Sequence, residues 1–331
     1  GPCIDSWMVQ LDNDLFAGSD RDYTNGFRLA VGGPTGFEPD YGRMRGWLHR
    51  FSGDEDSYPL FDRLADFDPS TLSYSWGAGI TQLMFTPDNH VPRVPPPGER
   101  PYAAWLGAEF SIQVRDQNSL SSVALAIGVT GDWALGEEAQ DIIHHDVSHS
   151  PLFNGWDSQL PEEVTLDLLL DHKRRLRLLD DWQSGLWSID GYYEFGGSLG
   201  TMRTAAYAGG LIRAGWNLPR TYSIPRLQVA SYANQYFSNR PHDPEGFRIY
   251  LLGGARGSLV LHDATLDGSL FQNWRFAVDS KPLVGELILG CGVGYGEFEL
   301  IYSRVVRSDE FDGQNTNQEY GSMQLAWRKQ F

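Results

Sequence analysis

The stretch LVGELILGCGVGYGEFELIY, residues 283–302, alternates bulky side chains with small or polar ones in two successive runs. From Leu289 to Tyr295 every second residue is apolar and a glycine separates each pair, whereas after Gly296 glutamates alternate with apolar residues. Successive side chains of a β-strand point to opposite faces. This period of two therefore predicts two strands joined by a short turn at Gly296, each with one apolar face, on which Cys291 lies.

The same alternation recurs along the whole chain and predicts about twelve strands. The segments are 7–13, 23–31, 74–85, 104–114, 120–130, 164–171, 187–199, 202–218, 246–260, 283–295, the run after Gly296, and 318–331. Many are around ten residues long, as a tilted membrane strand requires. One face holds Gly, Ser, Ala, Glu and Gln, and the other is bulky and aromatic. We therefore expect a single all-β domain over residues 1–331: a twelve-stranded antiparallel transmembrane β-barrel with short helices in its extracellular loops.

Composition agrees with this expectation and excludes other classes. Hydrophobic residues make up 41% of the chain, yet no stretch of eighteen apolar residues could form a membrane-spanning helix. The net charge of −17 argues against a nucleic-acid partner. Two cysteines do not make a disulfide framework. A soluble β-sandwich would also alternate, with its apolar face inward, and stays as the alternative fold. The amphipathic strand ending at Phe331 is typical of barrels in the outer membrane of Gram-negative bacteria.

The expected topology places the polar motifs at one rim. If the N-terminus is periplasmic, the first strand rises and ends at Asn13 and Asp14. The segments 87–102 and 131–163 then lie at the same outer rim, while 34–72 forms a long periplasmic insertion. A functional site at the outer rim follows from this arrangement.

Residues 134–148, ALGEEAQDIIHHDVS, predict a short helix in the 131–163 loop, with acidic residues early, as the helix dipole favours. Gln140 and His144 are four apart and share one face. His145 and His149 form another pair that could bind a metal such as Zn²⁺ with Asp146 nearby. The alternative is an exposed surface helix whose histidines have no role.

The motifs of covalent catalysis are absent from the sequence, with no Gly-x-Ser-x-Gly and no Ser-x-x-Lys. A histidine near carboxylate, amide and hydroxyl groups instead fits activation of water. Asp14 offers the hard oxygen ligand that Ca²⁺ prefers. The alternative for Asn13 and Asp14 is a turn in which both side chains bond their own backbone.

Three stretches carry a resemblance to a known family: LDNDLFAGSDRDYTNGFRL, ERPYAAWLG, and IGVTGDWALGEEAQDIIHHD followed by NGWDSQLPEE. They resemble the motifs of the lipid A 3′-O-deacylase (LpxR-like) family. The stretch SLGTMRTAAYAGGLIRAGWNLP and the terminal Phe331 also match its pattern. The resemblance spans essentially the whole chain. It implies a twelve-stranded outer-membrane barrel that removes the 3′-linked acyloxyacyl group of lipid A and depends on Ca²⁺.

The resemblance also implies roles for particular residues. His144 would activate water, and Asp14 would hold Ca²⁺ with loop carbonyls. Asn13 and Gln140 would offer amide donors or orient the imidazole, and Thr24 would position the loop or the water. Arg93 stands where the family has a basic pair, so only this one substrate contact carries over, and Asp146 or Glu162 would fill an acidic position.

Two other functions fit the same residues. A barrel phospholipase would use the same water, His and Ca²⁺ chemistry on glycerophospholipids. A non-enzymatic pore or adhesin would use the rim motifs only to brace its loops. In each case we expect a monomer in the outer membrane that binds no nucleic acid.

Overall fold

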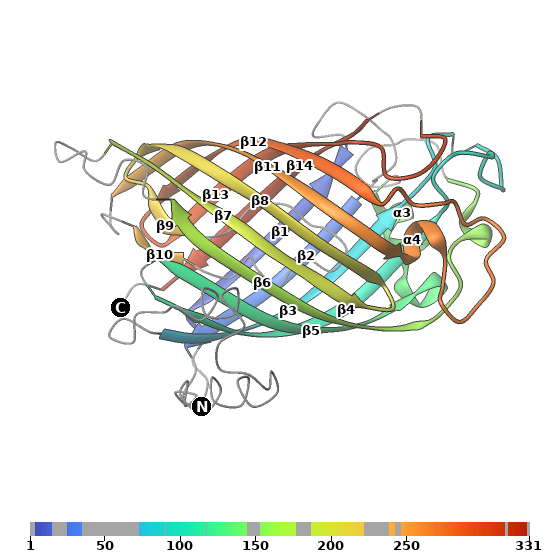
Figure 1. Ribbon diagram of the computed structural model, residues 1–331, viewed down its shortest axis with the longest axis horizontal. Helices are drawn as coiled ribbons and strands as arrows, with labels where there is room; N and C mark the ends of the chain where they lie inside the picture. The colour runs from blue at the N-terminus through green and yellow to red at the C-terminus, as the bar shows by residue number, and fades with distance from the viewer. Residues whose placement is uncertain are drawn as a thin grey trace, which may run out of the picture.

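Twelve of the strands in the computed structural model close into one antiparallel barrel (Figure 1). The structure describes residues 4–14, 25–34, 73–89, 91–116, 118–143, 153–176, 187–221, 238–241, 246–314 and 317–329. The barrel strands are β1 (Ser6–Asn13), β2 (Asn25–Pro34), β3 (Ser73–Phe85), β4 (Ala103–Arg115), β5 (Ser119–Thr130), β6 (Val164–Leu176), β7 (Trp187–Gly200), β8 (Arg203–Trp216), β11 (Phe247–Asp263), β12 (Leu283–Tyr295), β13 (Phe298–Arg307) and β14 (Gln318–Arg328).

The barrel closes between its first and last strands. β1 pairs with β14 from Ser6 opposite Arg328 to Asn13 opposite Gly321, and β1 also pairs with β2 along its full length. Each barrel strand therefore has a neighbour on both sides, so the closed sheet leaves no free edge. Among the described residues, no helix is long and apolar enough to cross a membrane.

The bulky residues face outward, which excludes the soluble sandwich. On β5, Leu125 and Ile127 are 43% and 51% exposed, whereas Ala124 and Ala126 between them are buried. The exposed Cys291 lies on the outer face of β12, as its position in the alternation predicts. An apolar exterior of this extent suits a lipid environment and not water.

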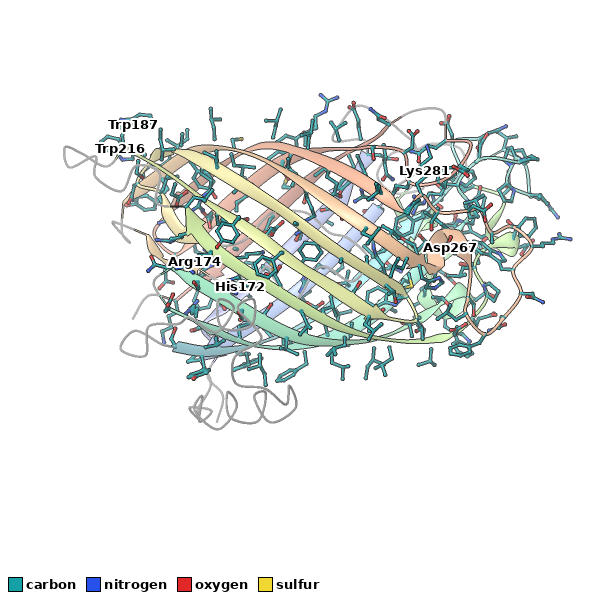
Figure 2. The ribbon with its side chains drawn as sticks, viewed as in Figure 1. His172, Arg174, Trp187, Trp216, Asp267 and Lys281 are labelled. Carbon is teal, nitrogen blue, oxygen red and sulfur yellow. The ribbon has the colours of Figure 1, made fainter. Side chains whose placement is uncertain are left out.

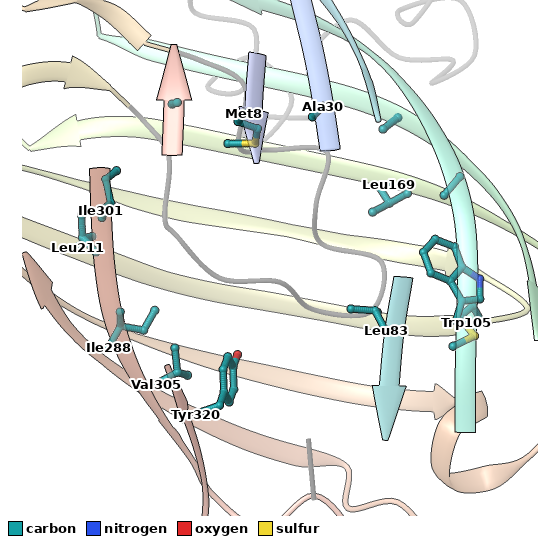
Figure 3. Packing of buried hydrophobic residues seen from close by; sticks show 14 of the residues in the cluster. Met8, Ala30, Leu83, Trp105, Leu169, Leu211, Ile288, Ile301, Val305 and Tyr320 are labelled. Atoms are coloured by element: carbon teal, nitrogen blue, oxygen red, sulfur yellow. The ribbon is translucent and has the colours of Figure 1, made fainter. Parts of the chain in front are cut away.

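Buried apolar residues such as Met8, Leu83 and Ile301 line the interior (Figure 3). Buried charged and polar side chains fill the space between them. Arg307 donates to Glu286 and Glu310, at 2.9 and 3.0 Å. These groups are almost completely buried, whereas side chains lining a wide aqueous channel would be exposed to water. The described interior is therefore a packed polar core, which argues against an open pore.

The two ends of the barrel differ (Figure 1). The chain termini lie at one end, with the small sheet of β9 (Pro219–Thr221) and β10 (Ser238–Pro241). Trp187 and Trp216 stack edge to face at the same end, with ring centroids 5.9 Å apart (Figure 2). Aromatic residues of this kind mark a membrane interface. The opposite end carries α3 (Gly136–Ile143) and α4 (Ala264–Asp267) and is the end that the sequence predicts to be extracellular.

The expected insertion 34–72 lies outside the described residues, apart from Pro34 at its start. Its flanking strands β2 and β3 end and begin at the end of the barrel where β1 starts, and the periplasmic position of the segment stays a prediction. A second long connection at that end, from Trp216 to Phe247, includes β9 and β10 and was not anticipated from the sequence.

Candidate functional site

A row of paired residues crosses four adjacent strands on the outer face of the barrel, close to the rim that carries α3. Asn13 of β1 pairs with Asn25 of β2, Asn25 with Met84 of β3, and Met84 with Ala104 of β4. Paired residues of neighbouring strands share a face of the sheet. Leu11, which shares the face of Asn13, is 40% exposed on the lipid side. The row therefore lies on the lipid-facing wall.

Helix α3 covers one end of this row. Met84 and Ala104 pack in one buried cluster with Tyr102, Ala134 and Trp156, and Ala139 of α3 packs against it. A Cβ atom on Gly136 would lie only 2.6 Å from the Cβ of Ala104 and 2.9 Å from the Trp156 ring, so the helix begins in direct contact with the wall. This approach explains the glycine at the start of α3.

The turn that leads into α3 is fixed to the wall by a polar side chain. Gln82 of β3 donates from Nε2 to the carbonyl oxygens of Ala134 and Leu135, at 2.7 and 3.1 Å. Leu135 has a φ of +56°, a left-handed conformation that a leucine adopts only when its surroundings impose it. A 3₁₀ helix at Gly131–Ala134 precedes it. The predicted helix over 134–148 therefore starts two residues late, at Gly136.

Gln140 lies on the buried side of α3, where a hydrogen bond holds its side chain. Its side chain is only 2% exposed, and its Oε1 accepts a hydrogen bond of 2.8 Å from Trp156 Nε1. Its Nε2 is buried without a hydrogen-bond partner among the described residues. The Trp156 ring stacks at a tilt on Tyr102, with centroids 5.2 Å apart. Gln140 thus has a fixed acceptor side and a buried donor side.

Asp14 directly follows β1 and is 1% exposed. It continues the inward side of the strand, where Asp12 accepts a 2.5 Å hydrogen bond from Ser322 Oγ, whereas Asn13 belongs to the outward side. A buried carboxylate is an oxygen ligand of the kind that hard cations prefer. The described residues hold no group of three or more His, Cys, Asp or Glu side chains that could bind a metal ion, and Asp12 and Asp14 are both buried carboxylates at this end of β1.

The connection between β3 and β4 lies at the same rim and carries Arg93, which is exposed. Its distal part is anchored in the barrel mouth, because buried Arg100 donates to Glu310 at 2.7 Å and to Thr265 of α4 at 3.0 Å. Glu162 is exposed at the rim, before β6. Arg93 is therefore an exposed cation at this rim.

Several predicted site residues lie outside the described residues: Thr24, His144, His145, Asp146 and His149. Asn13 lies at one end of the outer-face row, and α3, which bears Gln140, contacts the other end at Met84 and Ala104. Asp14 follows Asn13 on the inward side of the wall. Arg93 stands apart from this row, in the loop above it.

Tyr102 and Glu137, both at the rim, have displaced pKa values. Burial raises the pKa of Tyr102 to about 12. Partial desolvation, followed by the negative charges of Asp141 and Glu138, raises the pKa of Glu137. Tyr102 is therefore a neutral hydroxyl at ordinary pH, and the surface of α3 is strongly acidic.

Sequence reasoning missed Trp156, Asn25 and Gln82. Trp156 belongs to the stretch NGWDSQLPEE, but the residues around it in the sequence do not indicate that its indole bonds to Gln140. Gln82 is a polar residue on the apolar face of a strand, and this break in the alternation was the signal that could have marked it.

These features define an integral β-barrel of the outer membrane with a polar site on the lipid-facing side of its outer rim. The chain belongs to the family described as Outer membrane protein LpxR, which matches residues 4–329. Its fold is that of LpxR from Salmonella typhimurium, with a TM-score of 0.73 and 17% sequence identity over 98% of this chain and 99% of that one.

More distant similarity extends to other barrels. The β domain of the Bordetella autotransporter BrkA covers 99% of both chains with a TM-score of 0.44 and 9% identity. The transport unit of the Escherichia coli autotransporter AIDA-I covers 99% of this chain and 90% of that one, with a TM-score of 0.38 and 9% identity. No curated protein matches the chain.

Proposed function

We propose that this protein is an outer-membrane esterase that hydrolyses the 3′-linked acyloxyacyl group of lipid A in a Ca²⁺-dependent reaction. Lipid A is an amphiphile of the outer leaflet, with ester bonds just below its phosphorylated sugars. An enzyme for such a bond needs polar catalytic groups on the lipid-facing side of the wall, near the extracellular rim. Membership of the LpxR family supports this substrate class.

One observation carries the proposal: the outer-face row of Asn13, Asn25, Met84 and Ala104, covered at one end by α3. Polar residues are costly on a lipid-facing surface unless they have a use there. Asn13, from the first sequence motif, lies at one end of the row, and the helix that bears Gln140 lies at the other end. A bound acyl chain could lie along the exposed apolar wall below.

His144 is proposed as the general base. One helical turn separates it from Gln140 in the sequence, so both side chains belong to one face of a continuing helix. His144 would take a proton from water while the water oxygen attacks the ester carbonyl carbon. The proton would then pass to the leaving alkoxide of the sugar, and the products would be the free acyloxyacyl carboxylic acid and a hydroxyl on the sugar. Asn13 and Gln140 would donate hydrogen bonds to the carbonyl oxygen, and Thr24 would position the water.

Asp14 is proposed as a Ca²⁺ ligand. Its buried carboxylate fits a hard cation, and backbone carbonyls of the hairpin would have to complete the site. When bound, Ca²⁺ supplies positive charge that polarises the ester carbonyl. Arg93, exposed at the rim, is proposed to contact a lipid A phosphate. We propose that the protein acts as a monomer, because the active groups all come from one chain.

The test is mass spectrometry of lipid A from cells with and without the protein. The proposal expects lipid A that has lost the mass of its 3′ acyloxyacyl group only in cells that make the barrel. Parallel incubation of the purified protein with glycerophospholipid vesicles separates a phospholipase, which would release fatty acid from the vesicles and leave lipid A intact. Intact substrates in both assays would favour the non-enzymatic alternative.

A further inference from the structure

We propose that Trp156 is a positioning residue for hydrolysis, because it fixes the orientation of the Gln140 amide. This inference rests on the proposed function and assigns a task to a residue outside the set Asn13, Asp14, Thr24, Gln140 and His144. The distance from Trp156 Nε1 to Gln140 Oε1 is 2.8 Å, and both side chains are 2% exposed.

The chemistry of the two groups determines which way the amide faces. An indole N–H can donate a hydrogen bond but cannot accept one. The Gln140 atom next to Trp156 Nε1 must therefore be the amide oxygen, and the NH₂ group takes the other side. A glutamine amide without such a partner could rotate by 180° at little cost and present its oxygen in place of its NH₂ group. Trp156 removes this freedom.

Trp156 is itself held in place from several sides. Its ring packs on Tyr102, which directly precedes β4, and on the end of the wall through Ala104. A Cβ on Gly155 would lie 2.2 Å from the Tyr102 ring, so the backbone before Trp156 also lies against that ring. The position of the indole is thus tied to the barrel wall, and through the hydrogen bond so is the position of Gln140.

Because Trp156 fixes the amide oxygen of Gln140, it also fixes the position of the amide NH₂ group. Its Nε2 is buried and has no hydrogen-bond partner among the described residues, although a buried donor left unbonded is costly. We assign this donor to the ester carbonyl oxygen of the substrate, on which negative charge develops during attack by water. A donor fixed before substrate arrives stabilises that charge without reorganisation. The inference predicts an effect on turnover more than on substrate binding.

Trp156→Phe tests this assignment, because phenylalanine keeps the aromatic packing and removes the N–H. We expect kcat on lipid A to fall roughly tenfold or more with little change in KM. Trp274→Phe is the matched control. Trp274 Nε1 donates to the Ser158 carbonyl oxygen at 3.1 Å, so this variant also removes an indole hydrogen bond to the same loop, but not one to Gln140. Its kcat should stay close to that of the wild type.

A Gln140→Ala background provides the second readout. If Trp156 acts through Gln140, adding Trp156→Phe to Gln140→Ala should lower kcat no further. Equal losses of kcat in Trp156→Phe and Trp274→Phe, or additive losses in the double variant, would overturn the inference and leave a purely structural role. So would unchanged turnover in Trp156→Phe. An inactive wild-type protein would instead overturn the proposed function.

The hydrogen bond can also be checked without activity. In ¹⁵N spectra of the folded barrel, the indole N–H signal of Trp156, identified by its through-space contacts with the neighbouring Tyr102 ring, should shift upfield in Gln140→Ala. An unmoved signal would show that the bond is not formed, and would overturn the inference even where Trp156→Phe fails to fold.

Discussion

At the scale of residues, the end of β1 gives two neighbouring side chains different surroundings. Asn13 belongs to the lipid-facing side of the strand, while Asp14 lies buried on the opposite side. An amide on the lipid side suits a donor to the substrate, and a buried carboxylate suits a cation ligand. The two residues should therefore respond to mutation in different ways.

Asp14→Asn removes a charge and keeps the shape of the side chain. We expect the Ca²⁺ concentration for half-maximal activity to rise about tenfold or more, because ligand charge sets calcium affinity. In Asn13→Ala, turnover should fall while the Ca²⁺ dependence stays the same. Calcium titrations of lipid A hydrolysis measure both quantities. An unchanged titration in Asp14→Asn would show that Asp14 is only part of a turn.

His144→Ala should remove hydrolysis and leave a folded barrel, because the general base is lost and the wall is untouched. His145 points about 100° away around a helix, so His145→Ala should be much milder. Rates on lipid A, with heat-dependent gel mobility as the check on folding, compare the two variants. Equal losses would favour a metal site at His145 and His149 instead.

At the scale of elements, the position of α3 against the wall decides whether Gln140 can serve the site. Contact begins at Gly136 and is reinforced by Gln82, which bonds the carbonyl groups of the preceding turn. The helix is short, with eight described residues, and short helices depend on packing for their stability. The location of α3 therefore depends on its contacts with the wall as much as on its own sequence.

Gly136→Val should push α3 away from the wall, since the added atoms would meet Ala104 and Trp156. We expect activity to fall by more than about tenfold, the effect of misplacing a catalytic group by an ångström, while the barrel stays folded. Gly257→Val is the control, because a Cβ at Gly257 meets nothing within 4 Å. Full activity in Gly136→Val would contradict the contact.

The strands were predictable from the sequence because a period of two is imposed directly by the two environments of the wall. The predicted strand ends were wrong where the residues on the two faces no longer differ in polarity. β6 was expected to end at residue 171 but continues to Leu176. His172, on its outer face, is covered by Phe195 and bonded to Ser121, and Lys173 pairs inside with Glu194. Both polar residues are satisfied by other strands, which no local pattern reveals.

The site was only partly predictable for the same reason. Asn13, Asp14 and Gln140 stand in recognisable motifs, and topology alone brings their segments to one rim. The bond between Trp156 and Gln140 joins segments whose contact depends on how α3 packs on Tyr102 and Ala104. Packing of this kind follows from three-dimensional complementarity and has no signature in a single sequence.

At the scale of the whole molecule, the barrel is a rigid frame whose interior is held by buried ion pairs. Arg307 contacts Glu286, Glu310, Gln318 and Tyr320, which come from β12, β14 and the connection between β13 and β14. The same Glu310 accepts from Arg100, so the interior network reaches the loop that leads to Tyr102. Stability of the barrel and placement of the rim are linked through this network.

Arg307→Met should destabilise the barrel by roughly 3–5 kcal/mol, because it removes the buried cation that pairs with both Glu286 and Glu310. Arg304→Met on the same strand removes an arginine whose side chain is 50% exposed and paired with Glu319, and should change little. Urea unfolding in lipid vesicles measures both. Equal stability of the two variants would contradict the packed interior.

We propose that the site at the outer rim cleaves lipid A with the help of Ca²⁺. The most direct measurement is mass spectrometry of lipid A incubated with the purified, folded barrel, with Ca²⁺ and with a chelator. The account predicts release of the 3′ acyloxyacyl group with Ca²⁺, and no release with the chelator while the barrel stays folded. Lipid A that remains intact with Ca²⁺ present, or that is cleaved at full rate by the chelator-treated barrel, would contradict it.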